Sequence, residues 1–178
     1  MSRSQKGGQQ PLAPSRTRGL ILGCVFGAAF LNGMLASGIN RTLVDMPAWQ
    51  RVGAPAWAEF SRWADLGKRG LILYPLEGIG GAVLSTIAAI VFHRSRRSRM
   101  RQASVPISAA ALLALGGMLA TTQAAPTLLG TRRTSDPAAL KLALNGFAFW
   151  GGVRAVFQSL AFCANLWSLV AVSRNEGF

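Results

Sequence analysis

Residues 140–172 read LKLALNGFAFWGGVRAVFQSLAFCANLWSLVAV, and Arg154 stands near the middle of this apolar run. The run is longer than the ~20 mostly apolar residues with which a helix crosses a bilayer. An ionised side chain deep in a membrane helix costs about 2.5–3.5 kcal/mol on insertion scales. The stretch therefore predicts a transmembrane helix whose arginine faces a partner or a watery cavity.

One face of this predicted helix is polar. At about 100° per residue, that face carries Phe147, Trp150, Arg154, Gln158, Ala161 and Asn165. A second stripe is built of small residues, which let membrane helices approach closely: Gly151, Ala155, Ser159 and Cys163. The pattern leaves two interpretations of Arg154 open, a structural tie between helices and a member of a ligand or catalytic pocket.

The composition indicates a membrane protein. The chain has 178 residues, 51% of them hydrophobic, and a formal net charge of +13 from 19 Lys and Arg against 6 Asp and Glu. The basic residues lie mostly in short segments between apolar runs, which argues against nucleic-acid binding. Cys24 and Cys163 lie inside apolar runs without metal-ligand spacing, so we expect no metal, no disulfide and no cofactor.

Four apolar runs divide the chain. They cover about residues 19–39, 70–92, 105–125 and 140–172. The fold prediction is therefore all-α, a single four-transmembrane-helix bundle over residues 19–173, preceded by a disordered basic tail over residues 1–18. Asp136-Pro137 has the residue types of a helix start, an aspartate cap followed by a first-turn proline.

The connection over residues 40–69 predicts short helices. Asp45-Met46-Pro47 is a candidate helix start, and Pro55 is a candidate for the first turn of the next helix. The apolar side that we expect on this second helix consists of Trp57, Phe60, Trp63 and Ala64. Such an amphipathic helix suits the membrane interface, and it equally suits a cap over the helix ends.

Charge placement predicts the orientation. Four spans put both termini on the same side as the arginine-rich loop Arg94–Arg101. Basic segments favour the cytoplasmic side, so we expect a cell-membrane protein with both termini in the cytoplasm.

Helix geometry predicts a buried polar pocket. At ~1.5 Å of rise per residue, Glu77, Arg154 and Asn32 reach a similar depth. Glu77 and Arg154 then form a natural ion pair, and the indole of Trp150 lies within reach of the guanidinium. The candidate pocket residues are Asn32, Tyr74, Glu77, Trp150, Arg154 and Gln158.

Several short motifs resemble the anthrone-oxygenase-like family of four-helix membrane proteins. They are Leu43-Val-Asp-Met-Pro-Ala-Trp49 with Trp57 and Trp63, Leu73-Tyr-Pro75, and Trp150-x-x-x-Arg154 followed by Leu160-Ala-Phe162. Gly151-Gly152 stand where the family pattern has an asparagine. The resemblance covers about residues 19–172 and implies the four-helix fold. It also implies oxidation of aromatic substrates without a metal or flavin.

Three functions follow as hypotheses. The leading one is a multi-pass membrane protein whose polar pocket binds a small apolar or aromatic molecule. The second is the cofactor-independent oxygenase that the resemblance implies, and the third is a small transporter that couples protons through Glu77. Whether the chain is an enzyme is left open. Besides the lipid bilayer, a homo-oligomer is the remaining candidate partner.

Overall fold

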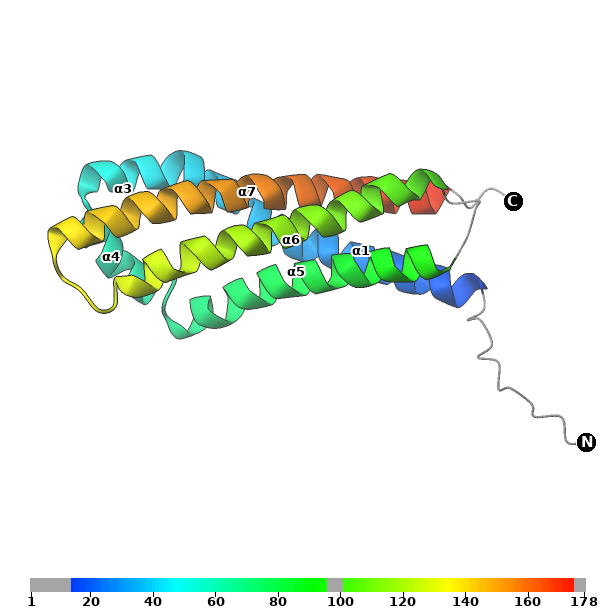
Figure 1. The fold of residues 1–178 in the computed structure, drawn as a ribbon, viewed down its shortest axis with the longest axis horizontal. Coiled ribbons are helices and arrows are strands. Elements are labelled where there is room, and N and C mark those ends of the chain that lie inside the picture. Colours follow the sequence, from blue (N-terminus) through cyan, green and yellow to red (C-terminus); the bar gives the residue numbers. More distant parts are fainter. Residues whose placement is uncertain (1–13, 96–100, 175–178) are drawn as a thin grey trace, which may run out of the picture.

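The computed structural model describes residues 14–95 and 101–174, and this part of the chain is helical without a strand. Four long helices run alongside one another over most of the length of the molecule (Figure 1). They are α1 (Pro14–Ala36), α5 (Lys68–Arg94), α6 (Arg101–Gly130) and α7 (Pro137–Ser173). The prediction of an all-α fold with four long apolar helices is confirmed.

Each of these helices belongs to a segment long and apolar enough to cross a membrane. The four segments are Arg16–Val52, Lys68–Arg94, Gln102–Gly130 and Pro137–Ser173. Large apolar side chains such as Phe26, Leu112 and Leu119 lie on the outer surface, where lipid would solvate them. The helices fit a membrane-embedded, multi-pass protein.

Two predicted basic segments lie partly outside the described residues. Of the predicted tail, residues 1–13 lie outside, while residues 14–18 already belong to helix α1. Of the predicted basic loop, residues 96–100 lie outside. Helices α5, α6 and α7 enclose the predicted spans 70–92, 105–125 and 140–172, and the predicted span 19–39 runs through α1 into α2 (Gly38–Asn40).

Small residues bring the long helices together in the middle. A Cβ built on Gly27 of α1 would lie 2.9 Å from Cδ1 of Leu84 on α5, and one on Gly80 of α5 would lie 2.7 Å from Cδ1 of Leu31 on α1. Each glycine thus receives a leucine from the opposite helix, as in close-packed membrane helices. Gly23 and Gly19, one and two turns earlier on the same face of α1, have open space beside them instead.

Two apolar clusters fill the ends of the molecule. One, near the start of α1 and the end of α7, includes Ile21, Phe92 and Val172. The other includes Trp57 and Phe147 at the opposite end. Between them the buried side chains are mainly small or polar, which places the polar interior at the middle depth.

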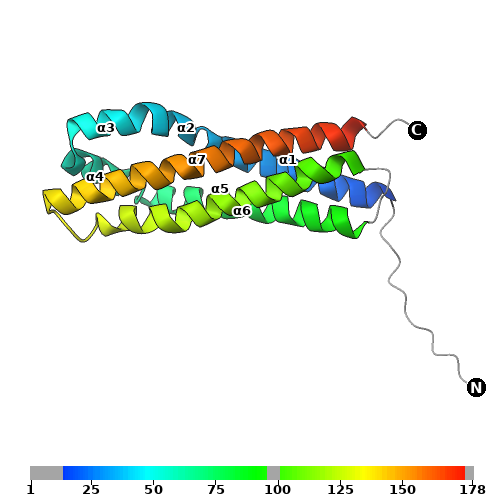
Figure 2. The ribbon, with the colours of Figure 1, turned by 45° about the horizontal axis from the view of Figure 1, so that its top comes forward.

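The first helical segment continues much further than predicted. Beyond α1 come α2 (Gly38–Asn40), a π-helical turn η1 (Arg41–Asp45) and α3 (Met46–Val52), which Figure 2 shows beside the first half of α7. Helix α3 begins at Met46 with Pro47 in its first turn, but Asp45 has right-handed helical dihedrals and no side-chain cap bond, so the predicted capping role of Asp45 is wrong. The wide π-helical turn just before Pro47 gives the proline ring room that a regular α-helix lacks.

The chain reverses at Gly53, whose φ of 115° favours glycine, and continues into α4 (Ala54–Trp63). Pro55 stands in the first turn of α4, as predicted. The buried face, however, carries Trp57, Ala58 and Ser61. Of the expected apolar side, Trp57 is thus buried, whereas Phe60 and Trp63 are exposed by 47% and 82%.

The two ends of the described chain meet. Nη2 of Arg18 donates to the carbonyl oxygens of Val172 (3.3 Å) and Ser173 (3.4 Å) at the end of α7. At the other end of α7, the Asp136 carboxylate accepts hydrogen bonds from the backbone N–H groups of Ala138 and Ala139. The predicted cap at Asp136 is thus confirmed.

Candidate functional site

A cavity of about 270 Å³ lies between the first half of α5 and the second half of α6. Helices α1 and α7 close it from the interior through Leu35, Phe147, Arg154 and Gln158. Most of its lining is aliphatic, including Leu66, Leu71, Ile79, Met118, Leu128 and Leu129. The site is therefore an apolar chamber with a few polar groups directed at one region.

The cavity reaches the side of the molecule between α5 and α6. Three of its lining residues, Leu71, Ile79 and Leu129, are exposed by 45%, 51% and 45%. These side chains belong to the long apolar helices, so this surface would face lipid chains in a bilayer. The chamber thus opens laterally rather than only towards water.

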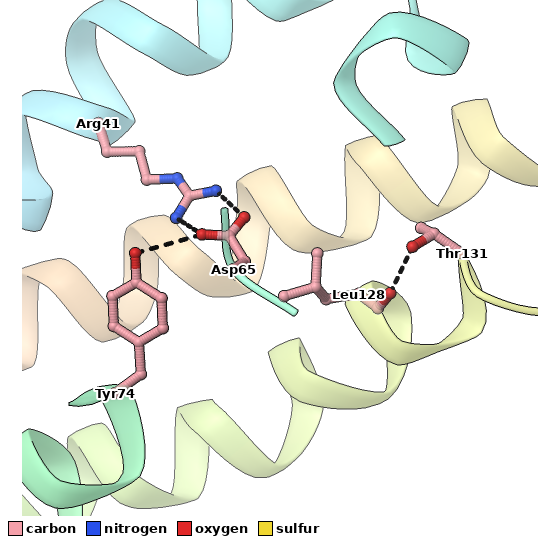
Figure 3. A network of polar contacts seen from close by, with 5 residues as sticks. All are labelled: Arg41, Asp65, Tyr74, Leu128 and Thr131. Carbon is pink, nitrogen blue, oxygen red and sulfur yellow. Dashed lines mark hydrogen bonds and ion pairs between the residues drawn. The ribbon is translucent and has the colours of Figure 1, made fainter. Parts of the chain in front are cut away.

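An ion pair borders the cavity at the end near α4. Nη1 of Arg41 donates to Oδ1 of Asp65 at 2.7 Å, and Nη2 donates to Oδ2 at 2.5 Å (Figure 3). The Asp65 side chain is only 2% exposed, whereas that of Arg41 is 21% exposed. A two-pronged arrangement of this kind is geometrically specific as well as strong. Arg41 also lies over the Phe147 ring, with its Cζ 5.2 Å from the ring centroid.

Helix α5 is joined to this pair by a third side chain. The hydroxyl of Tyr74 donates to Oδ1 of Asp65 at 3.2 Å (Figure 3). Asp65 therefore connects the π-helical turn η1, the segment after α4 and the first half of α5. The pair orders the chain around one end of the cavity.

Neighbouring arginines fasten the same region to the end of α6. Nη2 of Arg62 donates to the carbonyl oxygen of Thr131 at 2.8 Å, and Nη2 of Arg132 donates to that of Leu66 at 2.7 Å. The Thr131 hydroxyl in turn donates to the carbonyl oxygen of Leu128 (Figure 3). These bonds hold the segment that carries Asp65 in place.

Arg154 also lines the cavity, but it has no such partner. Within residues 14–95 and 101–174, no hydrogen bond or ion pair reaches its guanidinium, and its Nε is buried without a partner. Gln158, one turn further along α7, is buried and lines the same chamber. Arg154 borders a second, smaller hollow as well, together with Arg41 and Gly151.

The structure brings together three of the six predicted pocket residues. Tyr74, Arg154 and Gln158 line the cavity, whereas Asn32, Glu77 and Trp150 do not. The Asn32 amide donates to the Ala28 carbonyl oxygen of its own helix at 2.8 Å.

The predicted contacts of Arg154 are not formed. Glu77 is buried at 7% exposure, and across the described chain no hydrogen bond or ion pair joins its carboxylate to Arg154. The Trp150 ring meets Phe149 edge-on at 5.2 Å between centroids, and the cation–π contact near this site is made by Arg41 with Phe147. Arg154 and Glu77 share an interior level without touching.

Arg41 and Asp65 were not predicted as members of the site. Both stand in a segment that reads as a polar connection, where charged residues are ordinary. Their meeting depends on the continuation of the first helix through η1 and on the return of the chain at Gly53. The one available signal was that Asp65 stands nine residues before Tyr74, close to the start of the second apolar run.

Comparisons with known proteins add no relative. No protein-family profile, no curated protein and no solved structure matches this chain. The resemblance to the anthrone-oxygenase-like family therefore stays a prediction. In the described part of the chain, no three His, Cys, Asp or Glu side chains are grouped so that they could hold a metal ion.

Proposed function

We propose that this protein is a four-span bundle of the cell membrane, with both termini in the cytoplasm, that binds a small apolar or aromatic molecule. The observation that carries the proposal is the lateral cavity between α5 and α6. Ligand sites are typically concave and mostly apolar, with a few polar groups that orient the ligand. This chamber has that composition, and its polar members are Arg41, Asp65, Tyr74, Thr121, Arg154 and Gln158.

The size of the chamber limits the ligand. Ligand pockets commonly measure about 300–1,000 Å³, and a cavity of about 270 Å³ lies just below that range. It suits a compact molecule or a single hydrocarbon chain. The rings of Tyr74 and Phe147 offer apolar faces to either kind.

Helix α4 would lie at the membrane surface beside this site. Trp57 packs against Phe147 of α7 with ring centroids 5.7 Å apart, which supports a capping role. Phe60 and Trp63 are exposed on the other side, which suits contact with the interfacial layer of the bilayer. In our proposal α4 therefore serves as cap and interfacial helix at once.

Filling the cavity tests the proposal. Purified protein in lipid nanodiscs would be labelled with a photoreactive analogue of decanol, and an excess of unlabelled decanol would reveal the saturable part. We expect saturable labelling of cavity residues in the wild type, and its loss in Ala125→Phe, because a ring at position 125 occupies the chamber.

The matched control is Leu119→Phe, which places the same ring on the outer surface of α6. It should label like the wild type. Labelling that no competitor reduces in any variant would contradict the proposal.

A further inference from the structure

The charges around the cavity do not balance. Among its described lining residues the charged side chains are Arg41, Asp65 and Arg154. The one carboxylate of the three, Asp65, is taken by both Nη atoms of Arg41 and by the Tyr74 hydroxyl. The lining therefore carries one positive charge in excess, at Arg154.

Among the charged side chains of the described lining, Arg154 is also the one whose N–H groups make the fewest hydrogen bonds. A guanidinium has five N–H donors and stays protonated at every physiological pH. No hydrogen bond or ion pair to Arg154 occurs among residues 14–95 and 101–174, and the buried Nε shows that water does not reach that atom. A half-buried guanidinium without a direct ion-pair partner is poorly compensated, so this wall of the cavity favours an anion.

We propose that the ligand is an apolar monoanion, a fatty-acid-like carboxylic acid, whose carboxylate binds Arg154. This inference rests on the proposed function and specifies the ligand of the same cavity. A carboxylate matches the planar fork of the guanidinium with two parallel hydrogen bonds. Gln158 lies one turn along α7 on the same wall, and its amide supplies a further donor.

The rest of the chamber explains why the anion is apolar. The lining beyond the polar wall is aliphatic and ends at the half-exposed side chains of Leu71, Ile79 and Leu129. An acid bound at Arg154 would thus extend its hydrocarbon body towards the lateral opening. A chamber of about 270 Å³ has no room for a phospholipid with its headgroup and two chains.

Charge also argues for a single acidic group. The charged side chains of the lining sum to one positive charge, so a monoanion neutralises the lining, whereas a dianion such as a phosphate monoester would give the lining an excess negative charge. Glu77 does not compete for the same space, because it is not part of the lining.

The experiment compares acid and alcohol of equal chain length. Wild-type protein in nanodiscs would be labelled with photoreactive decanol, and unlabelled decanoate or decanol would compete. Hydrogen bonds between two charged groups are stronger than those of a neutral hydroxyl, so we expect decanoate to compete at least about tenfold more tightly than decanol. Decanoate should likewise raise the unfolding temperature of the wild type more than decanol does, a readout that needs no variant.

A variant then assigns the preference to one side chain. Arg154→Gln should abolish the preference for the acid, so that decanoate competes no more tightly than decanol. Arg133→Gln, an exposed arginine outside the cavity, should keep the preference for the acid. Arg154→Lys keeps the charge without the planar fork and should retain part of the preference.

The outcomes separate the two proposals. If decanol and decanoate compete equally in the wild type, the ligand is not an anion, although the cavity still binds apolar molecules. If Arg154 is instead a structural tie to Glu77, Arg154→Gln would lower stability but leave the ratio of acid to alcohol affinity unchanged. If neither compound competes, the proposed function itself fails.

Discussion

At the scale of single residues, the structure assigns different roles to two arginines at one cavity. Arg41 binds the Asp65 carboxylate and lies over the Phe147 ring, whereas Arg154 has neither kind of partner within the described chain. The first arginine orders the cavity and the second remains available to a ligand. Position in the fold, not residue type, makes this difference.

The Asp65 side chain gives a sharp test of the ordering role. Asp65→Asn removes the charge that Arg41 requires and leaves both arginines of the cavity unpaired. We expect a loss of about 3–5 kcal/mol in the free energy of unfolding, measured by denaturation in mild detergent. Tyr74→Phe removes one hydrogen bond of 3.2 Å and should cost only about 1 kcal/mol.

Asp45→Asn is the matched control for this test, because Asp45 is exposed and makes no cap bond. It should leave stability unchanged. The double variant Arg41→Gln/Asp65→Asn should lose less than the sum of its two single variants, since neither charge is then left without its partner. Equal losses from Asp45→Asn and Asp65→Asn would contradict the importance of the buried pair.

Interactions predicted correctly from the sequence join residues that are close in the chain, whereas the missed interactions join distant ones. The Asp136 cap depends on groups two and three residues away, and it was predicted correctly. The Arg41–Asp65 pair spans 24 residues and depends on a π-helical turn and a reversal at Gly53. Equal depth placed Glu77 near Arg154, but depth does not fix the direction of a side chain about the helix axis.

At the scale of helices, the apolar runs predicted the four long helices because bilayer thickness sets their length. The first connection was predicted less well. Asp45-Met46-Pro47 has the residues of a helix start, yet a π-helical turn lets the helix pass through it. Trp57 is buried and Trp63 is exposed on the same short helix α4. The packing of α4 against α7 determines which of the two tryptophans is buried.

Helix α5 begins against the segment that carries Asp65, and Gly70 makes this possible. A Cβ on Gly70 would lie 2.3 Å from the carbonyl oxygen of Asp65 and 2.6 Å from that of Ala64. Because both obstacles are backbone atoms, Gly70→Ala must displace the segment. We expect a loss of about 1–3 kcal/mol in unfolding free energy, together with weaker binding in the cavity.

Gly151 of α7 is the control for the same substitution. No atom lies within 4 Å of the place where its Cβ would stand, and the residue is inside a long helix. Gly151→Ala should therefore stabilise the protein by about 0.5–1 kcal/mol through helix propensity. A loss of stability at Gly151 would instead indicate that a second copy of the chain packs against the small-residue stripe.

At the scale of the whole molecule, the arrangement of the ends supports a definite topology. Arg18 binds the last carbonyl groups of α7, so the start of α1 and the end of α7 lie at one end of the molecule. Ser135 lies at the other end, in the connection between α6 and α7. With four spans and a basic cytoplasmic side, these two ends should lie on opposite faces of the membrane.

Cysteine labelling tests this orientation in intact cells. In a background without Cys24 and Cys163, the variants S135C and R174C introduce one thiol each at exposed positions. A membrane-impermeant maleimide should label S135C in intact cells and R174C only after lysis. Labelling of both from outside would contradict the four-span arrangement, and the reverse pattern would invert it. Inversion would leave the cavity intact, because it lies within the span and opens towards lipid in either orientation.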